Sequence, residues 1–103
     1  MTTSAAASGG PPIEVSDVVF VAASAEDIVT GLLGWSSCTV NRRLRFDGLA
    51  VRRTLKGRIQ LAFPAKSDRA GKRHYVIRPL DDSARVEIER QIFQALHDAG
   101  VAL

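Results

Sequence analysis

Cysteine is nearly absent from this chain of 103 residues: the only one, Cys38, has no partner for an internal disulfide bond. Long apolar runs are absent as well, and no stretch approaches the roughly 20 consecutive apolar residues that a membrane-spanning helix needs. The first twelve residues contain neither a basic stretch nor an apolar core, so they lack the pattern of a secretory signal. From these three absences we expect a cytoplasmic protein that does not interact with a membrane.

The residues that usually carry catalysis or bind metal ions are also scarce. His74 and His97 are the only histidines, and no set of cysteines and histidines has the spacing of a metal site. The segment from Gly31 to Gly34 lacks the lysine and the serine or threonine of a phosphate-binding loop. Cys38 lies in an apolar segment, where a free cysteine is usually a small buried hydrophobic residue. We therefore expect no enzymatic activity, no cofactor, no metal ion and no small-molecule substrate.

Length and composition predict one domain with one core. The chain has 46% hydrophobic and 24% charged residues, which is typical of a globular domain. Residues 1–12 are small and polar and include Gly-Gly and Pro-Pro pairs, so they are predicted to be a disordered tail. Residues 13–103 are predicted to fold as a single domain. Because a domain of this size buries only about 60–65% of its unfolded surface, we expect a homodimer formed through sheet extension or helix packing.

The pattern of apolar residues predicts an α+β fold, in which an antiparallel sheet of four to five strands is followed by one C-terminal helix. The pattern of residues 24–34 is compatible with a helix, a turn or a strand, and we expect a turn near 24–28. Between the strands that end at Pro64 and begin at His74, residues 65–73 are predicted to be a polar, basic loop. The predicted strands cover residues 13–22, about 30–41, 45–54, 58–63 and 74–78.

Two glycines indicate how the central hairpin is shaped. A one-residue slip at Gly48 would bring the apolar side chains around it onto one face, as a β-bulge does. Gly57 is expected to supply the positive φ of the hairpin turn that follows. The side chains that the slip would bring together are Leu44, Phe46, Leu49 and Val51.

The C-terminal helix has clear signals at both ends. Residues 81–83, Asp-Asp-Ser, offer three candidate N-caps, and their carboxylates suit the positive end of the helix dipole. Gly100 is expected to end the helix. One apolar stripe between these ends predicts the buried face. The stripe consists of Ile88, Ile92, Phe93 and Leu96.

Charge is distributed unevenly along the chain, although the total is only +3. Residues 1–41 carry −4, residues 42–73 carry +9 and residues 74–103 carry −2. A dense basic block of this kind favours a polyanionic partner, because each phosphate that it neutralises releases counterions. We expect folding to gather the eleven basic residues of this block onto one continuous patch.

The basic block predicts a nucleic-acid interface made by a hairpin and a loop. Trp35, Tyr75 and the phenylalanines do not form a paired stacking platform, so contacts are expected mainly to phosphates. Two alternatives remain: solvated residues that protect strand edges, or a protein–protein adaptor whose basic face docks an acidic partner. The predicted contacts are Arg52, Arg53, Lys56 and Arg58 from the hairpin, and Lys66, Arg69, Lys72 and Arg73 from the loop.

Several segments together resemble a known family. They are IEVSDV, LRFDGLAVR, a glycine turn with IQLAFPAK, a polar loop with Gly71, the pair Arg78-Pro79 and the helix RVEIERQIFQAL. Over roughly residues 13–97 the chain is similar to the stage V sporulation protein G family, the bacterial septation regulators. The most specific pieces are Phe63-Pro64-Ala65-Lys66 and the helix from Arg85 to Leu96.

The resemblance implies a fold, a partner and a role. Members of the family are small α+β proteins with an antiparallel sheet and a C-terminal helix. They form dimers that bind DNA, and in some cases RNA, and regulate genes of cell division and development. The basic loop of the family corresponds here to Lys66, Arg69, Lys72 and Arg73, which the charge distribution also selects.

Overall fold

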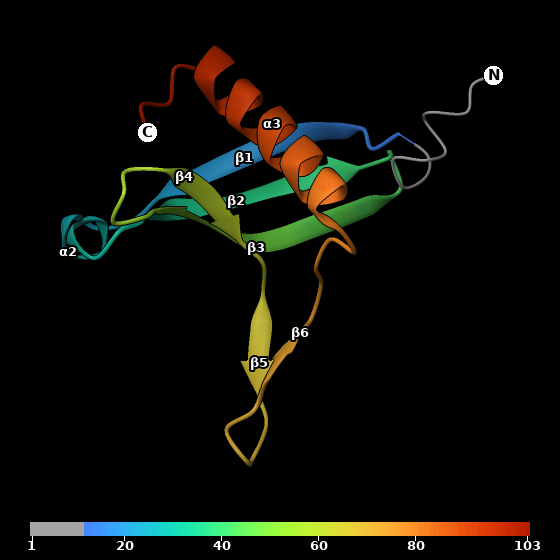
Figure 1. Ribbon diagram of the computed structural model, residues 1–103. Coiled ribbons are helices and arrows are strands. Elements are labelled where there is room, and N and C mark those ends of the chain that lie inside the picture. Colours follow the sequence, from blue (N-terminus) through green and yellow to red (C-terminus); the bar gives the residue numbers. More distant parts are fainter. Residues whose placement is uncertain (1–11) are drawn as a thin grey trace.

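The computed structural model describes residues 12–103, so all but the last residue of the predicted tail lie outside it. Its body is a four-stranded antiparallel sheet in the order β1-β2-β3-β4, with helix α3 lying across one face (Figure 1). A second sheet pairs β5 with β6, and a short helix, α2, joins β1 to β2. The bounds are β1 Val15–Ala22, α2 Ala25–Val29, β2 Leu32–Val40, β3 Leu44–Arg53, β4 Ile59–Ala62, β5 Ala65–Ser67, β6 Arg73–Tyr75 and α3 Asp82–Asp98.

The α+β class and the C-terminal helix are confirmed, and so is the order of the predicted strands. Asp81 caps α3: its side chain accepts a hydrogen bond from the Ala84 N–H at 2.8 Å. After the helix, Gly100 has a φ of 82°, as expected of the residue that follows a helix end. Within the described range 12–103, no helix is long and apolar enough to cross a membrane.

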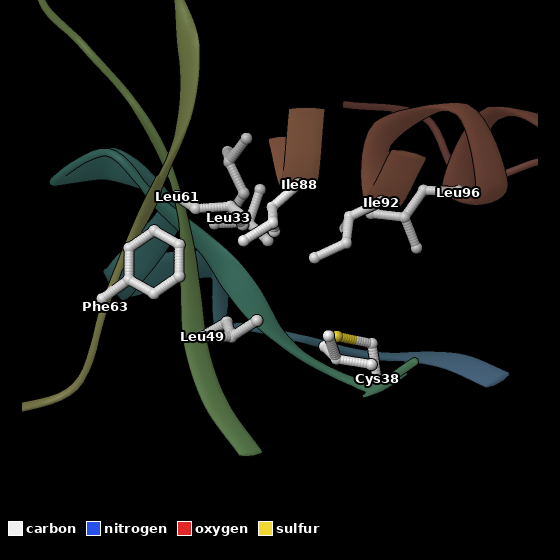
Figure 2. Packing of buried hydrophobic residues seen from close by; sticks show 10 residues of the cluster. Leu33, Cys38, Leu49, Leu61, Phe63, Ile88, Ile92 and Leu96 are labelled. Carbon is white, nitrogen blue, oxygen red and sulfur yellow. The ribbon is translucent and has the colours of Figure 1, made fainter. Parts of the chain in front are cut away.

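The core lies between the sheet and α3. Figure 2 shows Ile88, Ile92 and Leu96 of the helix facing the buried side chains of the sheet. This confirms the predicted stripe, with Phe93 partly buried against the same cluster. Cys38 is fully buried in it, as predicted, and burial raises the pKa of its thiol. The other core residues are Leu33, Cys38, Val40, Leu49, Val51 and Leu61 of the sheet and Phe63, which directly follows β4.

The predicted bulge at Gly48 is present. Cys38 of β2 lies opposite Phe46, whereas Ser36 lies opposite Leu49, so β3 has one extra residue between these pairs. Gly48 has a φ of 72°, a conformation that side chains disfavour. As a result Leu49 is buried and Phe46 packs against the core. Leu44 lies opposite the buried Val40 and so shares this face, but it is next to the turn at the end of the sheet and is 58% exposed.

Residues 25–29 form a helix, and the expected turn near 24–28 is therefore wrong. The Ser24 hydroxyl accepts a hydrogen bond from the Asp27 N–H at 3.2 Å, which is a normal helix N-cap. The helix ends at Thr30 because Gly31 then adopts a φ of 100°. The strand expected over about 30–41 is confirmed as β2.

The basic segment 65–73 is not a loop but most of a second hairpin. β5 and β6 pair antiparallel, with Ala65 opposite Tyr75 and Ser67 opposite Arg73. The strand predicted over 74–78 is correspondingly shorter and ends at Tyr75, although Val76 N–H still donates to Pro64 O at 2.8 Å. This hairpin, residues 65–75, projects from the sheet on the side away from α3 and is called the arm below (Figure 1).

Side chains of α3 form hydrogen bonds with backbone groups at both edges of the sheet. At β4, Glu89 accepts a hydrogen bond from the Leu61 N–H at 2.9 Å, and Arg85 donates to Leu61 O at 3.4 Å. At the start of β1, Gln91 donates to Ile13 O at 2.6 Å and accepts from the Val15 N–H at 2.8 Å. A second copy could extend the sheet at these positions only by displacing the helix side chains.

Candidate nucleic-acid interface

The tip of the arm is a turn organised by one carboxylate. Asp68 accepts hydrogen bonds from the Ala70 and Lys72 N–H groups, both at 2.9 Å, and its other oxygen lies 2.8 Å from His74 Nε2. The contact with His74 and these backbone hydrogen bonds hold the pKa of Asp68 below its usual range. The turn is therefore closed by the one acidic residue of a segment that is otherwise basic.

The arm carries cations on both of its faces. Arg73 and Tyr75 share one face, because they lie two residues apart on β6, and the Arg73 guanidinium carbon is 5.6 Å from the centre of the Tyr75 ring. Lys66 pairs with His74 on the other face. Arg69 belongs to the exposed turn between the strands. Four of the predicted contact residues, including Lys72, thus lie on one projecting ribbon.

The other four predicted residues lie at the end of the β3–β4 hairpin. Arg52 pairs with Gln60 and Arg53 pairs with Ile59, so the two arginines point to opposite faces of the sheet. The turn is closed by a hydrogen bond from the Thr54 N–H to Arg58 O at 2.8 Å. Gly57 has a φ of 84°, which confirms its predicted place in the turn. Lys56 and Arg58 are exposed there.

None of the eight predicted contact residues forms an ion pair within residues 12–103. Of the nearby carboxylates, Glu14 pairs with Arg42 of the basic block at 3.0 Å and Asp68 pairs with His74 at 2.8 Å, whereas the exposed Asp47 forms no ion pair within residues 12–103. The other ion pairs join residues within α3. The eight cations therefore remain available to an external anion, which is the electrostatic condition for phosphate binding.

The expectation of one continuous patch of eleven cations is wrong. Arg42 and Arg43 precede β3, whereas Arg52 and Arg53 end it, and a strand of this length spans about 30 Å. Arg45 instead lies along the sheet, where it donates hydrogen bonds to Asp17 O and to the Ser37 and Thr39 hydroxyls. The eight predicted residues remain in two groups, since the β3–β4 turn and the arm project in different directions (Figure 1).

The two groups meet at a cleft beside the base of the arm. The cleft has a volume of about 440 Å³ and is lined by Arg52 of β3 and Arg73 of β6. Its walls also include Arg78 and Arg85, which are not among the contact residues predicted from the sequence. Arg78 follows the arm and Arg85 lies in the first turns of α3, so four separate segments each contribute an arginine to the lining of this cleft, called the arginine cleft below.

The chemistry available at this surface is anion binding. No group of three or more histidine, cysteine, aspartate or glutamate residues in the described part of the chain is placed to hold a metal ion. Guanidinium groups bind phosphate oxygens through paired hydrogen bonds, and Tyr75 offers an aromatic ring at the same place. The chain matches no protein-family model and no curated protein. The resemblance to the stage V sporulation protein G family therefore stays a prediction.

Proposed function

We propose that this protein is a non-enzymatic, cytoplasmic nucleic-acid-binding regulator, acting on genes of cell division or development as the family resemblance implies. In this proposal the arm and the end of the β3–β4 hairpin contact phosphates of DNA, and also of RNA if the protein binds it. The observation that carries the proposal is that the eight predicted contact residues, which form two groups, have no carboxylate partner within residues 12–103. A polyanion that contacts them releases its condensed counterions, which favours binding.

The shape of the arm also supports binding to a nucleic acid. A two-stranded β-ribbon is one of the elements that fit the major groove of B-DNA, which is about 12 Å wide. With Lys66 on one face and Arg73 on the other, an inserted arm would meet the phosphates of both groove walls. Most such contacts position the protein, and sequence preference then depends on the few side chains that reach base edges.

A homodimer would present two arms to one nucleic acid. Of the expected modes, sheet extension has to displace Gln91 at β1 or Arg85 and Glu89 at β4. The sheet face opposite α3 instead exposes apolar side chains, with Val21 60% and Trp35 41% exposed on paired positions. Sedimentation analysis of the wild type and of Trp35→Glu tests this: a dimer that the substitution converts to a monomer places the contact on this face.

The proposed function is tested by a mobility shift with a library of genomic fragments at about 0.15 M salt, the physiological ionic strength. We expect retention of the fragments, and enrichment of a subset when unlabelled heparin competes. If heparin displaces all fragments equally, the binding is unspecific electrostatic attraction without sequence preference. Failure to retain any DNA or RNA fragment would overturn the proposal.

The alternative is an adaptor whose basic face docks an acidic protein in the septation machinery. It predicts capture of a protein partner by the immobilised chain that persists after the sample is treated with nuclease. A charge-reversed variant, with Lys66→Glu and Lys72→Glu, is the control, because it removes the basic face at two exposed positions. Capture that disappears with nuclease treatment instead supports the nucleic-acid proposal.

A further inference from the structure

The arginine cleft contains more positive charge than the fold needs. The lining contains Arg52, Arg73, Arg78 and Arg85 but only two acidic residues, which gives it a net charge of +2. Of these arginines, Arg85 is paired with Glu89 of α3 at 3.7 Å. One of these acids, Asp81, already accepts the capping hydrogen bond of α3. A bound anion would offset the positive charge of this lining.

The arginines differ in what else they do. Arg85 fixes the helix to β4 through its contacts with Leu61 O and Gln60, both at 3.4 Å. Arg78 makes no hydrogen bond and no ion pair with any residue in the described range 12–103, and it is exposed. No structural role accounts for the position of Arg78, which lines the cleft without contributing to the packing of the core.

An aromatic ring lies beside these charges. Tyr75 lines the same cleft and is 55% exposed, and the Arg73 guanidinium lies near its ring. A ring of this kind stacks on any nucleobase, because every base has a flat π-face. The cleft volume of about 440 Å³ is within the range of small-ligand sites. Phosphate-binding groups and a stacking surface are thus present in one space large enough for a nucleotide.

We propose that the arginine cleft binds one unpaired nucleotide unit, with its phosphate on the arginines and its base stacked on Tyr75. This inference rests on the proposed function, since it takes the nucleotide to be part of a bound nucleic-acid strand. A base inside a duplex is stacked between its neighbours and cannot reach the ring, so the cleft selects single-stranded or locally opened segments. The arm then has two roles, because its outer surface contacts the backbone while its base helps to hold one nucleotide.

The test compares single-stranded with double-stranded ligands. A fluorescein-labelled twelve-nucleotide strand and the matching duplex are titrated by fluorescence anisotropy at fixed salt concentration. The variants are Arg78→Ala, Tyr75→Leu and Tyr75→Phe, with Arg43→Ala as the matched control. Arg43 is exposed, has no ion pair within residues 12–103 and lies at the far end of β3. Its substitution therefore removes one positive charge, as Arg78→Ala does, but away from the cleft.

We expect Tyr75→Leu to weaken single-strand binding by about tenfold, the usual effect of losing one stacked base, with the duplex changed by less than about twofold. Tyr75→Phe keeps the ring and should bind like the wild type. Arg78→Ala should weaken single-strand binding several times more than Arg43→Ala. Equal effects of Arg78→Ala and Arg43→Ala, together with no effect of Tyr75→Leu, would overturn the cleft proposal and leave the proposed function intact.

Titration with adenosine monophosphate distinguishes the cleft proposal from the proposed function. It also shows whether the cleft binds a nucleotide within a strand or a free nucleotide. Its binding is followed by the NMR signals of the Tyr75 ring and of the arginine Nε–H groups. Saturable shifts that are absent from Arg78→Ala support the cleft site, and affinity as high as that of the strand would identify a free nucleotide as the ligand. If the protein retains neither nucleic acid nor this nucleotide, both proposals fail. If it retains only the nucleotide, the cleft binds a free nucleotide rather than a unit of a strand, and the proposed function fails.

Discussion

The arm offers the sharpest test of the proposed nucleic-acid interface. Arg69, Lys72 and Arg73 can be replaced together by alanine, because all three side chains are exposed and none forms an ion pair within residues 12–103. The turn itself depends on the Asp68 carboxylate and on backbone hydrogen bonds, which this triple substitution leaves in place. We therefore expect the variant to fold like the wild type while binding less tightly.

The expected size of the effect follows from counterion release. Each phosphate contact with B-DNA contributes about −0.9 to the slope of log K against log salt concentration. If each of the three side chains contacts one phosphate, their loss makes the slope shallower by about 2.7. When the salt concentration rises from about 50 to 200 mM, the factor by which the affinity falls should thus be about 40 times larger for the wild type than for the variant.

The measurement is a series of anisotropy titrations with duplex DNA at several salt concentrations, with thermal unfolding followed by circular dichroism. The matched control replaces Arg42, Arg43 and Arg90 by alanine, which also removes three positive charges but away from the arm. Its slope should stay near that of the wild type. An unchanged slope for the arm variant, or an equal change in the control, would refute the placement of the interface on the arm.

The remaining predictions concern the turn of the arm, the sheet edge and the buried thiol. Hydrogen bonds from His74 and two backbone N–H groups lower the pKa of Asp68, so they stabilise the turn above its ordinary pKa of 3.8. This stability is lost as the pH falls through the lowered value, which NMR amide shifts should report as opening of the turn. Gln91→Ala leaves partly buried backbone groups at β1 unpaired and should lower the free energy of unfolding in urea by about 1–3 kcal/mol. The exposed control Gln94→Ala should change it by less than about 0.5 kcal/mol. Because Cys38 is fully buried and its pKa is raised, it should react with a thiol reagent only after unfolding, and rapid labelling of the native protein would contradict its burial.

The body of the fold could be predicted because its elements bury one face. Ile88, Ile92 and Leu96 repeat at helical spacing, and Leu61 and Phe63 alternate along and just beyond β4, so burial leaves a pattern in the sequence. The bulge at Gly48 was predictable for the same reason, since apolar residues on its two sides change parity. The pattern predicted the face of Leu44 but not its exposure, because Leu44 lies at the end of the sheet.

The arm could not be predicted in this way. A two-stranded ribbon without a covering layer buries neither face, so its sequence needs no apolar alternation and resembles a polar loop. Its strands are instead defined by the turn, in which Asp68 binds two N–H groups and Gly71 adopts a φ of 82°. An aspartate followed three residues later by a glycine is the local signal that favours such a turn over an open loop.

The arginine cleft was missed because it exists only in the folded chain. Arg52 and Arg85 are more than 30 positions apart in the sequence, and they come together only because α3 crosses to the β4 edge. Charge counting by segment assigned Arg78 and Arg85 to a region with a net negative charge. The net charge of a continuous segment cannot reveal a surface to which four separate segments contribute.

Because the arm is separate from the core, substitutions in the arm and in the core should have different effects on stability and affinity. Because Ile88, Ile92 and Leu96 cover one sheet face and helix side chains occupy both edges, no residue of the arm is required to complete the core. The arm can therefore hold a density of positive charge that a buried strand could not, since its charges stay in water and repel each other only weakly there. Substitutions in the arm should accordingly alter affinity at nearly constant stability, whereas a core substitution such as Leu49→Ala should cost about 2–5 kcal/mol of stability and leave the affinity of the folded fraction unchanged.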